Sequence, residues 1–333
     1  MSALNVETCG FGNSRSQSLA DLPPPPGGKV GWPWTIATPH LPPLRPDGSP
    51  WPTIAIATPS YNQGQFIEET IRSVLLQGYP NLVYVVIDGG SSDNTTEVLR
   101  KYERHIDYWT SEADKGQADA INKGFARAQG EILAWLNSDD VYEKGVLAEV
   151  AELFLQQPDV DVFSGRCRMW YGDARDFLFE PSPLRSLEDF LRVGSNWLKG
   201  KIVVQPETFF RRSAFEKASG VCGQLYYCFD VALWMDMASA GCKFESVNRH
   251  WANLRIHKGQ KTRELANTHL EVARVAHDRL LANWTRVENP TAIAKDIFCA
   301  IEGLLKSEQE SSKRYAESTS YRLGRALTKM RFW

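Results

Sequence analysis

From residue 53 onward, hydrophobic and polar positions follow the periods of strands and helices in turn. Residues 53–58 form a short run rich in β-branched side chains that ends at a proline, which predicts a strand. Apolar residues within 65–77 recur at the spacing of an amphipathic helix. The apolar run 82–87 is typical of a strand buried on both faces of a parallel sheet. Helices at 94–103 and 116–128 and strands at 106–109 and 132–136 are expected next. This alternation predicts an α/β fold with a doubly wound sheet.

The second half of the chain has a less regular pattern. Short apolar runs predict strands at residues 160–164, 202–204, 208–211, 244–247 and 253–257. Helical spacing of apolar residues predicts helices at residues 229–240, 262–284 and 291–310. We therefore expect further strands on the sheet, followed by C-terminal helices.

The first 52 residues differ from the rest in composition. Eleven of the 18 prolines lie between Pro23 and Pro52, and proline lacks the backbone donor that helices and sheets require. The same stretch contains Trp32, Trp34 and Trp51, although free linkers seldom carry large aromatic side chains. We expect an extended Pro-rich strap that docks its tryptophans on the surface of the following domain.

Residues 313–333 contain six basic residues and one acidic residue, interleaved with aromatic and aliphatic side chains. A basic amphipathic helix of this kind can lie on an anionic membrane surface. It can equally be a solvated terminal helix that packs on the body of the protein. The sequence leaves both interpretations open.

Composition narrows the functional class. The chain has 38 basic and 40 acidic residues, a formal net charge of −2, which gives no sign of a nucleic-acid-binding surface. The six cysteines form no CxxC pair, which favours reduced thiols. The sequence shows no signal-peptide pattern and no apolar run approaching the ~18 residues that cross a bilayer. We expect a cytoplasmic protein with no nucleic-acid partner.

Polar loops follow the predicted strands, at the edge where a doubly wound sheet binds its ligands. They are residues 58–62, 88–93, 115–124 and 137–140. The last loop delivers an amide and two carboxylates, and Mg²⁺ or Mn²⁺ prefers such oxygen ligands together with substrate phosphates. Each loop also suits a simpler role as a turn or a helix cap. Four such loops at one edge favour a nucleoside diphosphate site, with an aromatic residue near the base and a helix N-terminus near the phosphates.

Four longer segments resemble a known family: TPSYNQGQFIEETIRSVLLQGYP, VVIDGGSSDNT, SEADKGQADAINKGFA and GEILAWLNSDDVY. On these motifs the chain resembles the family 2 glycosyltransferases, of the GT-A fold, over residues 30–260. The resemblance implies a Rossmann-like mixed sheet flanked by helices. It also implies inverting transfer of a sugar from a UDP- or dTDP-linked donor to a glycan or lipid-linked acceptor. The family setting is the synthesis of surface or extracellular polysaccharide on a lipid-linked intermediate, and the basic tail would suit work at the inner membrane face.

The resemblance assigns roles to residues at matching positions. It implies that the nucleotide-sugar is bound by Thr58, Pro59, Tyr61, Asp88, Asp93, Lys115, Gly116, Asp119, Asn122, Asn137 and Ser138. Residues 137–139 occupy the place of the family's Asp-x-Asp metal motif, with an asparagine instead of the first acid. The implied ligands of Mg²⁺ or Mn²⁺ are Asp139, Asp140 and His257, and the missing acid predicts a weaker metal site.

An inverting transfer needs a general base that takes the proton of the acceptor hydroxyl. The resemblance implies that this base is Asp230, at the start of a predicted helix, with Glu207 as the second choice. The alternative for Asp230 is a helix cap. The residues implied for the acceptor pocket and the leaving diphosphate are Gln205, Arg211, Arg255 and Lys258.

These expectations divide the chain into three parts. They are a Pro-rich extension (1–52), a GT-A domain (53–260) and C-terminal helices with the basic tail (261–333). Within the domain, residues 53–140 are expected to bind the nucleotide and residues 141–260 the acceptor.

Other functions fit the loops less well. A nucleotidyltransferase would need a Gly-rich basic loop after the first strand, and a dehydrogenase would need GxGxxG there; neither pattern is present. A catalytically silent nucleotide-sugar or partner-binding module of the same fold remains the alternative, because Asn137 replaces an acid.

Overall fold

The computed structural model describes residues 16–261, 265–307 and 309–310. In this part of the chain nine strands form one sheet, in the order β3-β2-β1-β4-β8-β6-β9-β5, with β7 beside β6. The strands are β1 (Ile54–Ser60), β2 (Leu82–Asp88), β3 (Tyr108–Ser111), β4 (Ile132–Trp135), β5 (Val141–Tyr142), β6 (Val162–Trp170), β7 (Phe177–Leu178), β8 (Thr208–Arg211) and β9 (Phe244–Arg255).

Strand direction divides the sheet into two parts. β1 is parallel to β2 and β4, and β2 is parallel to β3, so the carboxyl ends of these four strands lie at one edge. β8 runs antiparallel between β4 and β6, and β9 is parallel to β6 and antiparallel to β5. The predicted α/β class with a mixed sheet is confirmed.

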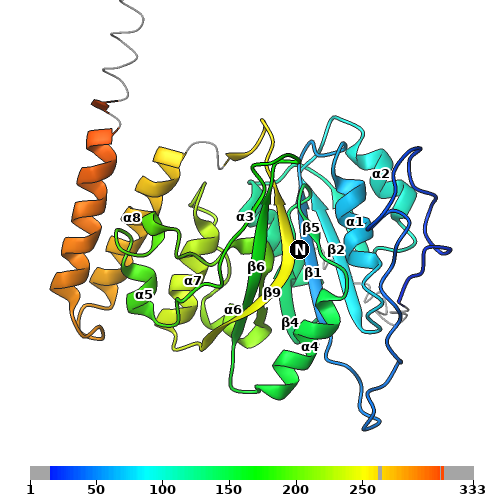
Figure 1. The fold of residues 1–333 in the computed structure, drawn as a ribbon, viewed down its shortest axis with the longest axis horizontal. Helices are drawn as coiled ribbons and strands as arrows, with labels where there is room; N and C mark the ends of the chain where they lie inside the picture. Colours follow the sequence, from blue (N-terminus) through cyan, green and yellow to red (C-terminus); the bar gives the residue numbers. More distant parts are fainter. Residues whose placement is uncertain (1–15, 262–264, 308, 311–333) are drawn as a thin grey trace, which may run out of the picture.

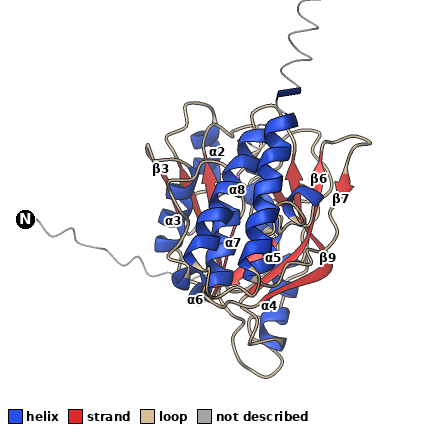
Figure 2. Cartoon of the chain, turned by 90° about the vertical axis from the view of Figure 1, so that its left-hand side faces the viewer, coloured by secondary structure: helices blue, strands red, loops and turns tan. Residues whose placement is uncertain are grey.

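Helices cover both faces of the sheet (Figure 1). They are α1 (Ile67–Leu75), α2 (Thr95–Tyr102), α3 (Gln117–Arg127), α4 (Val146–Gln156), α5 (Leu187–Leu191), α6 (Arg212–Lys217), α7 (Phe229–Ser239) and α8 (Leu265–Ala282), with short 3₁₀ turns η1 (Trp197–Lys199) and η2 (Gln205–Glu207). Residues 290–307 form a further helical segment. One face is covered by α3, α5, α6, α7 and α8, and the other by α1, α2 and α4. Figure 2 shows α7 and α8 side by side over their face.

The strands alternate between the two cores. In β1, Ala55 and Ala57 face the α3–α7 side, whereas Ile54 and Ile56 face the α1–α4 side. Successive side chains of a strand point to opposite faces, so a strand with helices on both sides is apolar at every position. This explains the continuous apolar runs in the sequence.

Three expected strands differ in the structure. Residues 202–204 pair with no strand, because Pro206 begins the η2 turn before the chain enters the sheet as β8. The strands expected at 244–247 and 253–257 are one strand, β9. Its middle is polar because Asn248 and Arg249 are exposed, while pairing with β6 continues across two register shifts.

The described part of the N-terminal strap packs on the α1–α2 face. Leu22, Trp34 and Trp51 are buried, and the indole nitrogen of Trp32 donates to the carbonyl of Tyr142 (2.7 Å). The expectation of a strap with docked tryptophans is confirmed. The basic tail 313–333 lies outside the described residues.

Arg72, a fully buried residue of α1, holds the strap in place. Its guanidinium donates to the carbonyl oxygens of Pro23 (2.9 Å), Pro33 (3.0 Å) and Trp34 (2.9 Å). It also donates to the hydroxyl of Tyr102 (3.0 Å). One cation thus satisfies three carbonyl groups of a proline-rich segment that has few backbone partners of its own.

None of the helices in the described residues is long and apolar enough to span a membrane.

We expect Arg72→Ala to lower the free energy of unfolding by about 3 kcal/mol, because it leaves buried carbonyl groups without donors. Denaturant unfolding followed by tryptophan fluorescence measures the change. Arg100→Ala, on the exposed side of neighbouring α2, is the control and should shift the midpoint little. Equal shifts for the two variants would contradict the role assigned to Arg72.

Candidate functional site

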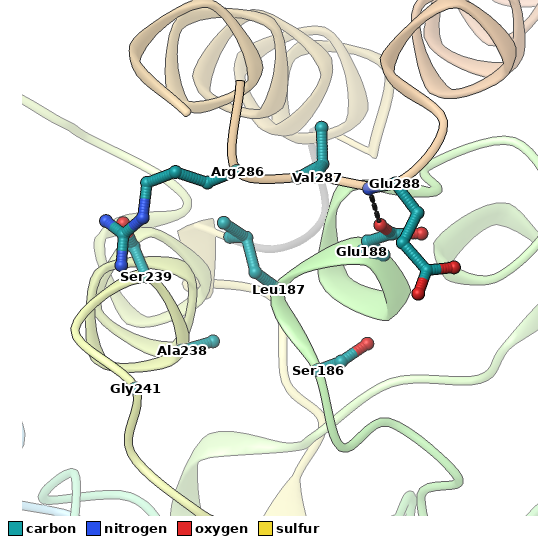
Figure 3. A pocket seen from close by; sticks show the side chains of 9 residues that line it. All are labelled: Ser186, Leu187, Glu188, Ala238, Ser239, Gly241, Arg286, Val287 and Glu288. Carbon is teal, nitrogen blue, oxygen red and sulfur yellow. Dashed lines mark hydrogen bonds between the residues drawn. The ribbon is translucent and has the colours of Figure 1, made fainter. Parts of the chain in front are cut away.

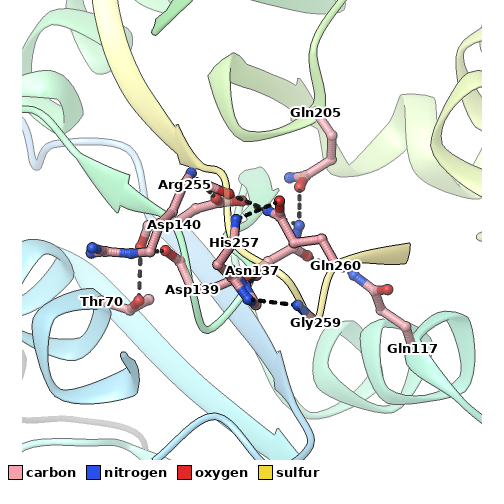
Figure 4. Close-up of polar contacts among 10 residues, drawn as sticks. All are labelled: Thr70, Gln117, Asn137, Asp139, Asp140, Gln205, Arg255, His257, Gly259 and Gln260. Carbon is pink, nitrogen blue, oxygen red and sulfur yellow. Dashed lines mark hydrogen bonds and ion pairs between the residues drawn. The ribbon is translucent and has the colours of Figure 1, made fainter. Parts of the chain in front are cut away.

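The candidate site lies at the carboxyl edge of β1, β2 and β4. The loops after these strands meet there, as parallel strands require. The end of β9 joins them, because Arg255 and His257 contact the loop that follows β4. Figure 4 shows how the polar side chains converge at this point.

Asn137 joins three elements at the end of β4. Its carbonyl oxygen accepts from Gln117 of α3 (2.7 Å), and its amide nitrogen donates to Gln205 of η2 (3.0 Å). The same nitrogen lies 3.3 Å from a carboxylate oxygen of Asp140. Gln205 in turn donates to the carbonyl of Trp135 (2.6 Å). Since its amide is used in this way, Asn137 connects α3, η2 and Asp140 structurally. It does so at the position where the family motif has its first acid.

Asp140 is buried, with 1% of its surface exposed. One carboxylate oxygen accepts the backbone N–H of Arg255 (3.0 Å), and the other faces Asn137. Burial, and then the charge of Asp139, raise the pKa of Asp140 well above its usual range. The structure therefore does not bring Asp140 to the open side of the site, where it was expected as a metal ligand.

Asp139 does face His257. Its carboxylate lies 2.9 Å from Nε2 of the imidazole, and both side chains are about 15% exposed. Gly259 donates its N–H to Nδ1 (3.2 Å), so Nε2 carries the proton and donates to Asp139. The ring of Phe66 packs against the imidazole at 4.6 Å. The structure thus unites the two residues that sequence analysis placed 118 positions apart.

Arg255 was expected to neutralise diphosphate charge, but its guanidinium is already engaged. Nε donates to the carbonyl of Asp139 (2.9 Å), and Nη2 forms an ion pair with Glu69 (2.9 Å). The group lies between the rings of Phe66 and Trp170, at 5.0 and 4.2 Å. Arg255 therefore braces the end of β9 against the loop after β4. Lys258, in the loop that follows β9, is exposed.

The donor set offers little to a cation by itself. Among the residues that the structure describes, no group of three or more His, Cys, Asp or Glu side chains could hold a metal ion. Asp139 and His257 remain, and Mg²⁺ is often bound by one or two carboxylates plus substrate phosphates. The residues thus fit a cation that shares its ligands with a bound diphosphate, once His257 releases Asp139.

The two acids of the loop after β2 brace it. Asp88 is fully buried and accepts from Ser91 Oγ (2.5 Å), Ser91 N (2.9 Å) and Ser111 Oγ (2.6 Å). Asp93 accepts from the backbone N–H groups of Gly64 (2.9 Å) and Thr95 (3.0 Å). Burial raises the pKa of Asp93, but these hydrogen bonds outweigh it and leave that pKa below its usual value. Both expected base-binding acids therefore fix the loop on which a base would rest.

Residues at the end of β1 differ in exposure. Thr58 is buried and its hydroxyl lies 3.1 Å from that of Tyr84; Pro59 is buried as well. Tyr61 is 63% exposed, so its ring is open to a stacking partner.

The start of α3 carries further expected residues. Lys115 is exposed, and Gly116 has a φ of +106°, a conformation that favours glycine. Asp119 accepts the backbone N–H of Lys115 (3.0 Å). Asn122 instead binds Val221 through both backbone groups, at 2.8 and 3.0 Å. Its amide is thus used to hold the chain near residue 221, away from the expected contact with the ribose diphosphate.

Asp230 lies in the first turn of α7. The neighbouring Phe229 and Trp234 pack on Trp135 of β4, with ring centroids 6.5 and 5.7 Å away, so α7 begins beside the end of that strand. Burial raises the pKa of Asp230 to about 6, although the backbone N–H of Val231 opposes the rise. A carboxylate with this pKa can act as a general base near neutral pH.

Glu207 and Arg211 are placed less favourably. Glu207 is 1% exposed, and burial raises its pKa well above the usual range. One of its oxygens accepts from Val204 N (3.1 Å), and the η2 turn directs the side chain into the interior. Arg211 pairs with Ile132, at the opposite end of β4 from Asp139, and donates to carbonyls at the end of α4, because β8 is antiparallel to β4. Arg211 was expected to line the acceptor pocket, but the structure places it away from the site.

Ser138 is buried within the loop after β4. Sequence analysis missed Gln117 and Glu69, although both lie in quoted motifs.

A hollow of about 420 Å³ lies at the far end of α7, beside Ser239, Arg286 and Glu288 (Figure 3). It is separated from Asp230 by the length of the helix, so it is not part of the site described above.

Comparison with known proteins agrees with this geometry. Residues 55–219 match the family model described as glycosyl transferase family 2. The protein named TuaG, for teichuronic acid biosynthesis in Bacillus subtilis, is 36% identical over 119 residues, which cover 34% of this chain and 46% of that protein. A poly-beta-1,6-N-acetyl-D-glucosamine synthase of Staphylococcus epidermidis is 30% identical over 111 residues, 33% of this chain and 27% of the synthase. The matches thus span less than half the length of these relatives.

Solved structures show the same fold. The S. aureus TarS fragment 1–349, in complex with UDP-GlcNAc, superposes with a TM-score of 0.55 at 17% identity, over 69% of this chain and 66% of that one. The fold and the polar edge define an α/β domain of the GT-A type. The chain belongs to glycosyltransferase family 2, through residues 55–219.

We expect Asn137→Asp to destabilise the protein by about 1–3 kcal/mol, although it restores the acid of the family motif. The new carboxylate would lose the amide donor and lie 3.3 Å from Asp140. Denaturant unfolding at pH 7 measures the change. Asn248→Asp is the control, because exposed Asn248 only accepts from Arg166 and keeps that acceptor. A stability equal to that of the control would refute the structural role of Asn137.

Proposed function

We propose that this chain is an inverting glycosyltransferase that moves a sugar from a UDP- or dTDP-sugar to a hydroxyl of a glycan or lipid-linked acceptor. The observation that carries the proposal is that two acids lie beside the end of β4. Asp139 is in the loop that follows this strand, and Asp230 follows Phe229, whose ring packs on Trp135, the last residue of the strand. The names of TuaG and the S. epidermidis synthase support a role in surface or extracellular polysaccharide synthesis.

The nucleotide would lie across the loops after β1 and β2. Tyr61 is exposed and can stack on the base, while the braced loop 88–93 offers backbone groups to its polar edge. The diphosphate would meet the N-terminus of α3, near Lys115 and Gly116, where backbone N–H groups and the helix dipole favour anions. The UDP-GlcNAc bound by S. aureus TarS supports a nucleotide-sugar donor of this type.

Asp139 and His257 are the residues that would hold Mg²⁺ or Mn²⁺. Such a cation would neutralise charge on the leaving diphosphate. The side chain of Gln260 donates to the carbonyl of Arg255 and accepts the backbone N–H of His257, and these bonds hold the loop 256–261. Release of His257 from Asp139 would therefore also loosen this loop. Metal binding and the position of this loop are therefore expected to be coupled.

Asp230 would take the proton of the acceptor hydroxyl as that oxygen attacks the anomeric carbon. Its raised pKa suits this transfer, because a stronger base than an ordinary carboxylate is still ionised near neutral pH. Glu207, the second choice for the general base, faces the interior, so it is not proposed for this role.

The first test measures binding. UDP should raise the melting temperature, and Mn²⁺ should raise it further, because each ligand stabilises the native state by about 2.7 kcal/mol at 100 times its Kd. Asp139→Asn should keep the shift with UDP and lose the increment with Mn²⁺. Asp159→Asn, at an exposed acid that forms a surface ion pair, should keep both. If Asp139→Asn keeps the Mn²⁺ increment as Asp159→Asn does, the metal role of Asp139 is refuted.

The second test measures turnover. Hydrolysis of UDP-sugars without an acceptor should fall about 10²–10⁴-fold in Asp230→Asn, with UDP binding unchanged. In the native chain the rate should rise with pH to a plateau above about 6, because only ionised Asp230 acts as a base. Tight binding with no turnover in the native chain would favour the silent module instead.

A further inference from the structure

A carboxylate from outside the matched domain holds the chain just before Asp230. Glu271 lies on α8, beyond residues 55–219. It accepts the backbone N–H groups of Tyr226 (3.2 Å), Tyr227 (2.7 Å) and Cys228 (2.9 Å). Its side chain is 12% exposed. Three consecutive backbone donors thus converge on one nearly buried carboxylate.

These contacts hold the residues that lead into α7. Cys228 is the N-cap residue of α7, and its side chain caps no N–H group. The backbone donors at a helix start need partners, and a negative charge near them is favourable. Burial raises the pKa of Glu271, but the hydrogen bonds from Cys228, Tyr227 and Tyr226 outweigh it and leave that pKa below its usual value. Glu271 therefore stays ionised and holds, from another helix, the segment that leads into α7.

We propose that Glu271 is a positioning residue for the transfer reaction: from α8 it fixes the segment 226–228 that leads into α7, and thereby the place of Asp230. This inference rests on the proposed function, in which Asp230 is the base. It assigns α8 an indirect part in the reaction, although this helix lies outside the segment that the family model matches.

In the part of the chain that the structure describes, α8 and the loop 256–261 supply charged groups near the two acids. Asp230 faces Glu271 of α8 and the thiol of Cys228 at the start of its own helix. Glu271 faces Lys261 of the loop 256–261 and lies 3.7 Å from Arg274 on α8. Since the charge of Glu271 adds to burial in raising the pKa of Asp230, its removal should lower that pKa.

The contacts of Glu271 with the segment 226–228 also orient a pair of aromatic rings. The rings of Tyr226 and Tyr227 meet edge to face at 4.8 Å, and Tyr226 is 56% exposed. The ammonium group of Lys261 lies 4.3 Å from the ring of Tyr226. Glu271 thus connects Asp230, the segment beside it and the loop that carries His257.

The experiment compares Glu271→Gln and Glu271→Asp with Asp278→Asn. Asp278 is an exposed acid on the same helix, and its substitution removes the same charge without touching the segment 226–228. Glutamine places an NH₂ group against N–H donors, whereas aspartate keeps the charge but shortens the side chain. The readouts are hydrogen exchange of the 226–228 amides, kcat and KM for UDP-sugar hydrolysis, and the pH profile of the rate.

We expect Glu271→Gln to speed exchange of the 226–228 amides at least about tenfold and to lower kcat about 10–100-fold, with KM for the donor little changed. Its acid limb should move to lower pH, because Asp230 loses a negative neighbour. Glu271→Asp should keep the acid limb in place and recover part of the exchange protection. Asp278→Asn should match the native chain in all three readouts.

Two results would overturn the inference while the proposed function stands. Exchange in Glu271→Gln equal to that in Asp278→Asn would show that the contact is absent in solution. Faster exchange with unchanged kcat and pH profile would show a contact that serves stability alone. If Asp230→Asn keeps its turnover, the proposed function fails and the positioning role fails with it, and that result is independent of the exchange data.

Discussion

The structure depends on the need to satisfy buried polar groups at the carboxyl end of β4. An apolar strand ends there, and the amide of Asn137 joins α3, η2 and Asp140 at once. Asp140 in turn receives the backbone of β9 at Arg255. Buried polar atoms without partners are costly, so these contacts fix the elements that meet at this point. Asp139 is the other acid of this loop, and its carboxylate faces His257.

Packing on the other side of the same strand places the second acid. Trp135 stacks on Trp234 at 5.7 Å, and this contact holds the start of α7 beside the end of β4. The segment that leads into α7 is also held from behind by Glu271 of α8. The proposed transfer needs two acids at a set separation, and it would rely on a rigid aromatic contact and on a helix from the C-terminal part of the chain.

The motifs predicted most of the edge but not the use of each side chain. Thr58, Tyr61 and Asp139 lie where the motifs indicated, because strand ends in a parallel sheet share one edge. Asn122 and Arg211 fulfil structural roles instead, since each binds backbone carbonyl groups of another segment. A sequence gives the residue type at a position, but it does not show which partner occupies a polar group that can bind several.

The sequence by itself determined the alternation of strands and helices, the docked strap and the four polar loops, because period and residue type act locally. It also indicated Asp139, Asp230 and His257 as chemical groups. Only the tertiary structure decided that His257 lies on Asp139, that Asp140 is turned inward and that Glu271 reaches the start of α7. Each of these contacts joins residues more than 40 positions apart. Such contacts depend on how whole elements pack, and no local pattern encodes that.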